Sequence, residues 1–376
     1  MKFVHFSDTH LGFRQYGIYE RETDFYRAFE NAVRKIIEER PDFVLHTGDL
    51  FDVPKPPPRA LWVAQRCFAK LREKGIPVYA ITGNHDMLFR RGSLPPQVLF
   101  RDMGVRLLTE EDPFVMHSDL FIGGVPYYPK HQDSMLKEQL KIVSQKAGKK
   151  KSILMMHQGT DRHLKNGYEI SMDDIPNNFS YYAMGHIHAR ITENFGLGKL
   201  VYPGSADLWS ANEIDDYKRR GKGFTLVDMH GDEPSVQNVD IPLEREILRE
   251  KADSGSLEKF TEELLGRLSQ LSRKPMLYLD VKEGSLEKSA VHDILQEKLS
   301  GAVLTLRMNY SAETVKGLKV ERSFSPNQID DIIDEILGKN EKSRLASAIF
   351  RMLSEGNTEA AIEESEKFLS RLGGNK

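Results

Sequence analysis

The sequence predicts an α/β fold, and two observations lead to this prediction. In the first 241 residues, short apolar runs of strand length end in polar, turn-like residues. Helical patterns lie between several of these runs, most clearly over residues 20–39, where apolar side chains recur at helical spacing at Phe25, Phe29, Val33 and Ile36. Strands that alternate with helices imply an α/β sheet that is covered on both faces.

Six strands of this first region are predicted from runs that end in the same way. They are "KFVHFSDTH", "DFVLHTGDLFD", "IPVYAITGNHD", "SILMMHQG", "YYAMGHIH" and "KLVYPGS". The segments 114–128 and 223–241 are instead typical of hairpins, with two apolar stretches around a polar turn. Hairpins pair their strands antiparallel, so the sheet is predicted to be mixed.

The pattern changes at about Pro242, and two further parts are predicted beyond it. Residues 242–322 alternate strands with helices at 256–271 and 287–299, which indicates a small α+β domain. Residues 323–376 are nearly all helical in pattern, and their first helix begins at a cap formed by Ser325 and Pro326. The predicted domains are therefore 1–241, 242–322 and 323–376.

Composition narrows the class of protein. A chain of 376 residues, 39% of them hydrophobic, can form two or three domains with sizeable cores. The formal net charge is only −3, so any contact with a polyanion must be local. The single cysteine, Cys67, excludes internal disulfides and a cysteine-rich metal site, and we expect it to be buried. Without a secretory signal or an apolar run of about 18 residues, we expect a cytoplasmic protein, nucleoid-associated in a prokaryote, that does not contact membranes.

Polar side chains gather where the predicted strands end, and such strand ends share one rim of an open α/β sheet. The residues on this rim are Asp8, His10, Asp49, Asn84, His85, Asp86, His157, His186 and His188. Carboxylates, imidazoles and an amide oxygen are ligands that Mn²⁺, Fe²⁺ or Zn²⁺ accepts. Because these residues come from five strand ends, the sequence predicts two metal ions.

Each of these motifs taken singly also has a plainer interpretation. Asp8 and His10 fit a turn with an exposed imidazole. Asp49 fits an ordinary strand-end turn, and His157 fits a histidine of the core. The "GHIH" motif is more specific, because alternate residues after a strand point to one side. Taken together, in this order and all at strand ends, the motifs favour a metal site.

The ordered motifs "DTH", "GDLFD", "GNHD", "HQG" and "GHIH" resemble those of the calcineurin-like metallophosphoesterases. Within that superfamily the chain is most similar to the SbcD-like nuclease subunit of DNA double-strand-break repair complexes. The start "MKFVHFSDTHLG", the Pro-rich turn after "GDLFD", and the runs "YYAMGHIH" and "VYPGS" carry this narrower resemblance. It implies a mixed two-sheet sandwich with flanking helices, followed by a small α+β domain that caps DNA and a C-terminal helical segment that binds an ATPase.

The resemblance also implies seven ligands for two Mn²⁺ ions. They are Asp8, His10, Asp49, Asn84, His157, His186 and His188. Asp8, His10 and His188 are assigned to one ion, and Asn84, His157 and His186 to the other. Asp49 bridges the two ions, because cations about 3.5–4 Å apart need a shared carboxylate between them.

His85 is the implied catalytic residue, an imidazole that faces the substrate and protonates the departing oxygen. We expect Asp86 either to accept a hydrogen bond from His85, and so fix its tautomer, or to cap the following turn. Asp52 departs from the family pattern, since many relatives have a His there that contacts the DNA backbone. Its carboxylate would repel a phosphate unless it is paired.

Basic runs and apolar helices suggest partners. Candidate DNA contacts are Arg90, Arg91, Lys149–Lys151 and Lys218–Lys222, although such runs are more often simply solvated. Residues 58–71 and 94–105 carry more apolar residues than one buried face needs, including Leu61, Trp62 and Phe68. These three residues are either core or part of an interface, and we expect a homodimer.

Apolar stripes in the tail, at residues 329–337, 345–353 and 361–369, either pack on their own domain or bind a partner. The resemblance favours an SMC-like ABC ATPase as that partner. The predicted function is a two-metal DNA nuclease, an exonuclease on duplex ends and an endonuclease on single strands, that acts with this ATPase in double-strand-break repair. The alternatives are a phosphatase or phosphodiesterase for a small nucleotide or a phosphoprotein, and a non-catalytic scaffold that binds DNA ends.

Overall fold

The computed structural model describes residues 1–87, 93–231, 233–282, 287–311 and 341–354, with the single residues 333, 338, 364 and 368. The chain divides into two compact units, Met1–Ala312 and Glu313–Lys376. The domain boundaries at 241 and 322 stay predictions. In the described ranges, no helix is both long and apolar enough to cross a membrane.

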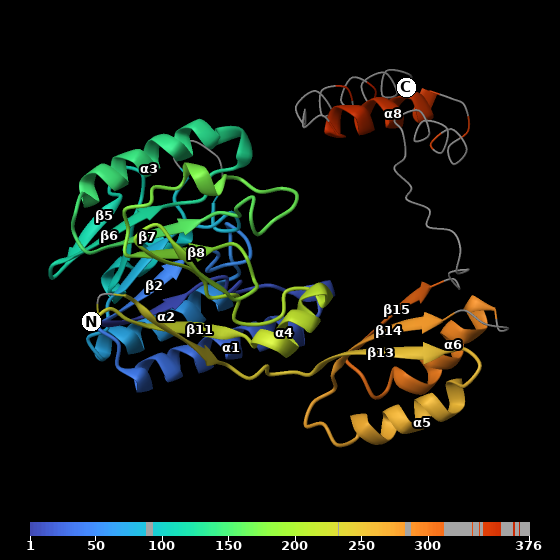
Figure 1. The fold of residues 1–376 in the computed structure, drawn as a ribbon. Coiled ribbons are helices and arrows are strands. Elements are labelled where there is room, and N and C mark those ends of the chain that lie inside the picture. The colour runs from blue at the N-terminus through green and yellow to red at the C-terminus, as the bar shows by residue number, and fades with distance from the viewer. Residues whose placement is uncertain are drawn as a thin grey trace. The chain divides into compact units, whose positions relative to one another are not determined.

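Two six-stranded sheets form most of the first unit (Figure 1). The first sheet has the order β12 (Ser235–Asp240), β11 (Gly223–Asp228), β1 (Lys2–Phe6), β2 (Phe43–Thr47), β3 (Val78–Ile81) and β4 (Val105–Leu107). The second has the order β5 (Phe114–His117), β6 (Leu120–Val125), β7 (Ser152–His157), β8 (Tyr181–Gly185), β10 (Gly198–Tyr202) and β9 (Ile191–Phe195). In the first sheet, β1 to β4 are parallel and the antiparallel strands β11 and β12 lie at one edge. In the second sheet, β6, β7, β8 and β10 are parallel, with an antiparallel strand at each edge. The predicted mixed two-sheet fold is confirmed.

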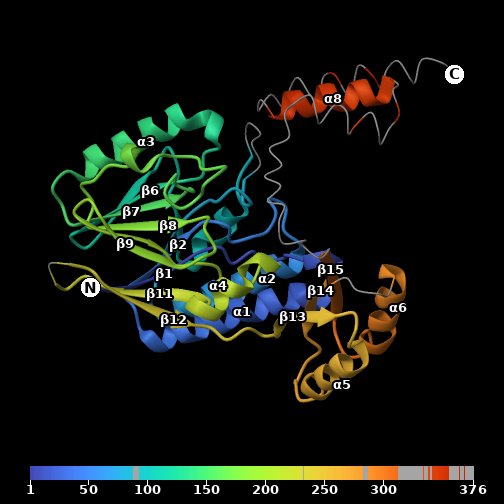
Figure 2. The same ribbon diagram turned by 45° about the vertical axis from the view of Figure 1, so that its right-hand side comes forward.

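Helices cover the outer face of each sheet, and the inner faces of the two sheets pack against each other (Figures 1 and 2). Helices α1 (Tyr19–Glu39) and α2 (Pro58–Glu73) pack on the first sheet, and α3 (Asp133–Ala147) packs on the second. An apolar layer between the sheets includes Phe3, Phe43, Ile153 and Tyr181. Strands β2, β3, β7 and β8 are buried at every residue. These strands have nearly continuous apolar runs because helices cover one face of each sheet and the other sheet covers the opposite face.

Two predictions about buried positions are confirmed. The four apolar residues of α1 that recur at helical spacing, Phe25, Phe29, Val33 and Ile36, all lie in the core. Cys67 of α2 is buried as well, and burial raises the pKa of its thiol to about 12. This thiol is therefore protonated and structural at neutral pH.

The predicted α+β segment forms a parallel three-stranded sheet of β13 (Ile247–Asp253), β14 (Met276–Lys282) and β15 (Thr305–Ser311). Helices α5 (Leu257–Leu268) and α6 (Lys288–Leu299) share its apolar core. This sheet packs on α4 (Ile214–Arg220) and the loop before it through a small apolar cluster of Leu208, Ile214, Ile247, Met276 and Tyr278. Arg245 adds a buried ion pair, with its Nε 2.7 Å from Oδ2 of Asp24 in α1.

One helix of the second unit is described, α8 (Glu341–Ser354). Leu345, Ile349 and Met352 of the predicted apolar stripe are half-buried in it, and Phe350 is exposed. The predicted stripes at 329–337 and 361–369 lie outside the described residues, apart from Ile333, Glu364 and Phe368. The ATPase-binding role of this tail stays a prediction.

Candidate metal centre

The seven predicted metal ligands lie where strands of both large sheets end. The first sheet contributes four of them, Asp8 and His10 after β1, Asp49 after β2 and Asn84 after β3. The second sheet contributes His157, which is the last residue of β7, and His186 and His188 after β8. Parallel strands end at a common edge, and the packing of the two sheets brings their edges together. The site is therefore built from both halves of the sandwich.

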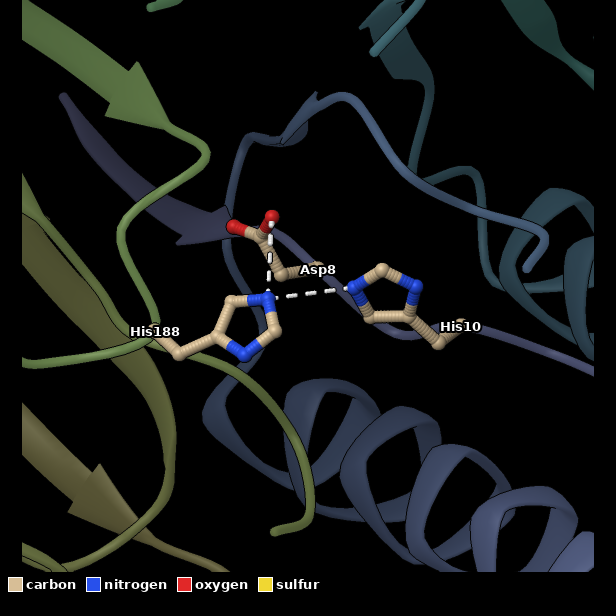
Figure 3. Close-up of side chains that lie close together, drawn as sticks. All are labelled: Asp8, His10 and His188. Atoms are coloured by element: carbon tan, nitrogen blue, oxygen red, sulfur yellow. Dashed lines mark hydrogen bonds and ion pairs between the residues drawn. The ribbon is translucent and has the colours of Figure 1, made fainter. Parts of the chain in front are cut away.

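Asp8, His10 and His188 form the first group (Figure 3). The Nε2 atoms of His10 and His188 lie 3.1 Å apart. Oδ1 of Asp8 lies 3.8 Å from the same Nε2 atom of His188. Figure 3 shows the Asp8 carboxylate and the His10 ring on two sides of this one nitrogen. Two imidazole nitrogens and a carboxylate thus converge on one point, as ligands of a cation do.

Asn84, His157 and His186 form the second group. Oδ1 of Asn84 lies 3.1 Å from Nε2 of His157 and 3.0 Å from Nδ1 of His186. Asp49 lies between the two groups, with its Oδ2 3.3 Å from Nε2 of His157 and 3.9 Å from Nε2 of His10. It therefore has the position that a bridging carboxylate requires.

The far nitrogens of two rings are fixed by hydrogen bonds. Nδ1 of His157 lies 2.7 Å from the main-chain oxygen of Thr47, and Nδ1 of His188 lies 3.1 Å from Oε1 of Glu213. Both acceptors require a proton on Nδ1, which leaves each Nε2 free to ligate. For His157, Nε2 then faces only the acceptor oxygens of Asp49 and Asn84. That arrangement calls for a cation, either a proton or a metal ion.

Charge and burial act in opposite directions on the ligands. Burial alone would lower the pKa of His157, but the Asp49 and Asp8 carboxylates and the Thr47 main-chain oxygen together raise it to about 9. The pairing of His157 with Asp49 holds the pKa of the Asp49 carboxyl below its usual range in spite of burial. Burial lowers the pKa of His186 to about 4 and also lowers that of His10. Those two rings are neutral near pH 7, the form that binds metals.

Four of the seven predicted ligands have a strained backbone. The φ angle is 51° at Asp8, 44° at His10, 52° at Asp49 and 87° at His186. Residues other than glycine rarely adopt such left-handed conformations, which cost about 1–3 kcal/mol each. The described chain has only three other positive-φ residues besides its glycines, so strain is concentrated in this site. Strain of this kind clusters where the protein needs a particular side-chain direction.

Close packing explains why a glycine directly precedes the predicted ligands Asn84 and His186. A Cβ atom on Gly83, just before Asn84, would lie 2.1 Å from Oδ1 of Asp49. A Cβ atom on Gly185, just before His186, would lie 2.1 Å from the main-chain oxygen of Thr47. Only glycine allows these strand ends to approach so closely.

Comparison with known proteins identifies the family. A model of the calcineurin-like phosphoesterase family matches residues 1–190, a span that includes all seven predicted ligands. Three archaeal relatives are each named DNA double-strand break repair protein Mre11. The relative from Methanococcus maripaludis is 33% identical over 377 residues, covering 98% of this chain and 99% of its own. Those from Methanocaldococcus jannaschii and Sulfolobus acidocaldarius are 39% and 31% identical, covering 80% and 98% of this chain and 81% and 98% of their own.

The chain belongs to the Mre11 family of calcineurin-like phosphoesterases. The resemblance predicted from the ordered motifs is confirmed. The phosphoesterase family implies a dimetal site, and the residues present fit one. Nε2 of His157 faces only oxygen acceptors, and Asp49 lies between two groups of nitrogen and oxygen donors. The assignment of individual ligands stays a prediction.

His85 lies beside the predicted ligands of this Mre11-family site. Its main-chain N–H donates to Oδ1 of Asp49 at 2.9 Å, and its Nδ1 donates to the main-chain oxygen of Asp52 at 2.8 Å. The ring, 29% exposed, therefore keeps Nε2 free for a substrate. Of the two alternatives predicted for Asp86, the hydrogen bond from His85 is wrong, and the cap on the following turn stays a prediction, because residues 88–92 lie outside the described residues. Asp86 instead accepts main-chain N–H bonds from Leu50, Phe51 and Gly83, and so joins the loops after β2 and β3.

The Asp52 carboxylate lies beside His10 and Trp209, but neither ring offsets its charge near pH 7, so the expected repulsion of a phosphate stays a prediction. Its Oδ1 lies 3.5 Å from Nδ1 of His10 and accepts a hydrogen bond from Nε1 of Trp209 at 3.4 Å. The Trp209 ring lies over the site, with its centre 6.0 Å from that of His10 and 5.9 Å from that of His188. Sequence reasoning missed Trp209, Glu213 and Glu169, whose Oε1 lies 3.7 Å from Nε2 of His186. No motif spacing marks these three residues.

The candidate DNA contacts are only partly accessible. Lys222 is 1% exposed, so the prediction that it contacts DNA is wrong. The other basic residues of the two lysine-containing runs, Lys149–Lys151 and Lys218–Arg220, are exposed and remain candidates. Arg90 and Arg91 lie outside the described residues.

The close approach at Gly83 leads to a testable prediction. Gly83→Ala places a methyl group against the Asp49 carboxylate, so we expect loss of most Mn²⁺ binding, measured by metal analysis after dialysis. Gly266→Ala is the matched control, because a Cβ atom there, in helix α5, contacts nothing within 4 Å. If Gly83→Ala binds as much Mn²⁺ as the wild type, Asp49 and Asn84 do not form the site described.

Proposed function

We propose that the chain is a two-metal DNA nuclease that processes DNA ends in double-strand-break repair. The observation that carries this proposal is the position of Asp49, 3.3 Å from His157 and 3.9 Å from His10, between two groups of ligand atoms. The named function of the relatives, repair of DNA double-strand breaks, points to DNA as the substrate. We include both exonuclease activity on duplex ends and endonuclease activity on single strands.

Two divalent cations bound there would supply Lewis acidity that activates a water and offsets negative charge on a phosphodiester. The side chains of the site are placed to bind two cations and an anionic substrate. Asp49 stands between the two groups, and neutral His10 and His186 add no negative charge that would repel the substrate. We propose Mn²⁺ as the metal, because an imidazole-rich site favours transition metals over Mg²⁺, which prefers oxygen ligands.

His85 is the proposed general acid. Its proton on Nδ1 is fixed by the Asp52 main-chain oxygen, so only Nε2 is available to the substrate. An imidazolium in this place can stabilise negative charge on the phosphorus centre and protonate the departing sugar oxygen. His85 also lies against the predicted ligand His10, with ring centres 4.8 Å apart. The proton donor is thus adjacent to the reaction centre.

The strained backbone at four predicted ligands argues against the alternative of a non-catalytic scaffold. Left-handed backbone at Asp8, His10, Asp49 and His186 costs stability, and a protein that only binds DNA gains nothing from it. The small-nucleotide and phosphoprotein alternatives share the same metal chemistry. A test with different substrates is therefore needed to distinguish these alternatives from a DNA nuclease, because the geometry of the site is the same for all of them.

The proposed partners are DNA, a second copy of the chain and an SMC-like ABC ATPase. For the homodimer, exposed apolar side chains in the two predicted segments support the proposal: Trp62 of α2 is 52% exposed, and Leu94 and Leu99 are 75% and 61% exposed. Where such side chains form a contiguous patch, they mark an interaction surface, and a second copy of the chain would cover them. For the ATPase, the half-buried apolar stripe of α8 offers a face of the kind that enters an apolar groove.

The proposed function predicts metal-dependent DNA cleavage. Purified protein incubated with end-labelled duplex and single-stranded DNA should cleave both with Mn²⁺, much less with Mg²⁺, and not at all with EDTA. Cleavage that survives EDTA would contradict the metal mechanism. Turnover of a small phosphodiester or a phosphopeptide with DNA left intact would support the phosphatase alternative instead.

If His85 is the general acid and not a metal ligand, its replacement should lower the rate of DNA cleavage without lowering the amount of bound metal. His85→Asn should keep the Mn²⁺ content of the wild type while turnover of DNA falls by about 10²–10⁴-fold, the usual contribution of general acid catalysis. Metal analysis and single-turnover cleavage on the same preparation measure both quantities. A variant that loses Mn²⁺ in parallel with activity would show that His85 is a ligand.

A further inference from the structure

Lys222 is a buried lysine in a run of basic residues. Its side chain is 1% exposed, and its ammonium donates three hydrogen bonds. The acceptors are Oε2 of Glu213 at 2.6 Å, Oγ of Ser205 at 2.7 Å and the main-chain oxygen of His188 at 2.8 Å. A buried ammonium is stable only when it is paired and fully hydrogen-bonded, and this one is. Lys222 thus contacts the metal-site loop instead of a solvent-exposed phosphate.

Glu213 connects Lys222 to the ring of His188. Its other oxygen, Oε1, accepts a hydrogen bond from Nδ1 of His188 at 3.1 Å and one from the main-chain N–H of Ser210 at 3.0 Å. Both carboxylate oxygens therefore have fixed partners. Lys222 contacts His188 in two ways, directly at its main-chain oxygen and through Glu213 at its ring.

We propose that Lys222 is a positioning residue for the metal site of Asp8, His10 and His188, and that it acts through Glu213. This inference rests on the proposed two-metal function. Lys222 balances the charge of Glu213, which otherwise would add an unpaired buried carboxylate to the site. With Glu213 held, the Nδ1 proton of His188 is fixed and its Nε2 points to Asp8 and His10.

The effect of Lys222 is specific to one of the two metal sites. In the second group, His157 is fixed by the Thr47 main-chain oxygen and His186 lies next to Glu169. The described hydrogen bonds of Lys222 reach neither of these residues. Loss of Lys222 should therefore weaken one metal and spare the other, whereas a general loss of structure would weaken both.

The test is a Mn²⁺ titration of the full chain without DNA, by calorimetry and by electron paramagnetic resonance. We expect the wild type to bind two ions per chain and to give the exchange-coupled signal of a Mn²⁺ pair. Lys222→Met and Glu213→Gln should each weaken one binding event about 10–100-fold, leave the other unchanged, and give the signal of isolated Mn²⁺. Lys218→Met, an exposed residue of the same basic run, is the matched control and should change neither event.

Other results would overturn the inference. Two unchanged binding events in Lys222→Met, or two events weakened equally together with a lower melting temperature of the metal-free protein, would show a merely structural ion pair. If Lys222→Met does not fold, the double variant Lys222→Met/Glu213→Gln removes both buried charges, and the same loss of one event is expected. A wild type that binds fewer than two ions would contradict the proposed function itself, which separates the two failures.

Discussion

The contact between β2 and the second sheet is the constraint on which the metal centre depends. The main-chain oxygen of Thr47, at the end of β2, accepts the Nδ1 proton of His157 from β7 at 2.7 Å. Its hydroxyl donates to the main-chain oxygen of Met184 in β8 at 3.2 Å. These bonds fix the register of one sheet on the other where both supply ligands. Gly185 keeps the approach open, because any side chain there would collide with Thr47.

Charge and strain follow from that geometry. Buried carboxylates and imidazoles lie within about hydrogen-bond distance of each other, and each pairing shifts the pKa of its neighbours. Fixed acceptors behind the rings, such as Thr47 for His157 and Glu213 for His188, decide which nitrogen faces the centre. The folded chain thus holds the donor atoms in place with left-handed backbone at four of the predicted ligands.

The fold, and the candidate site residues that directly follow a strand, could be predicted from the sequence. The predicted ligands could be named from the sequence because each follows an apolar strand, and strand ends of one sheet share an edge. Residues that act through tertiary contacts were missed, because nothing local marks them: Trp209 and Glu213 reach the site from the loop beyond β10. The Asp86 prediction failed because a carboxylate next to a histidine in a tight turn can point elsewhere, here to main-chain N–H groups of the neighbouring loop. Lys222 looked exposed in a basic run, and only packing shows that it is buried.

The central claim is that Asp49 lies between two cations. The most direct measurement is anomalous X-ray scattering from Mn²⁺ in crystals of the full chain. The account predicts two peaks about 3.5–4 Å apart on either side of the Asp49 carboxylate, one near Asp8, His10 and His188 and the other near Asn84, His157 and His186. A single peak, or two peaks that do not share Asp49, would contradict it.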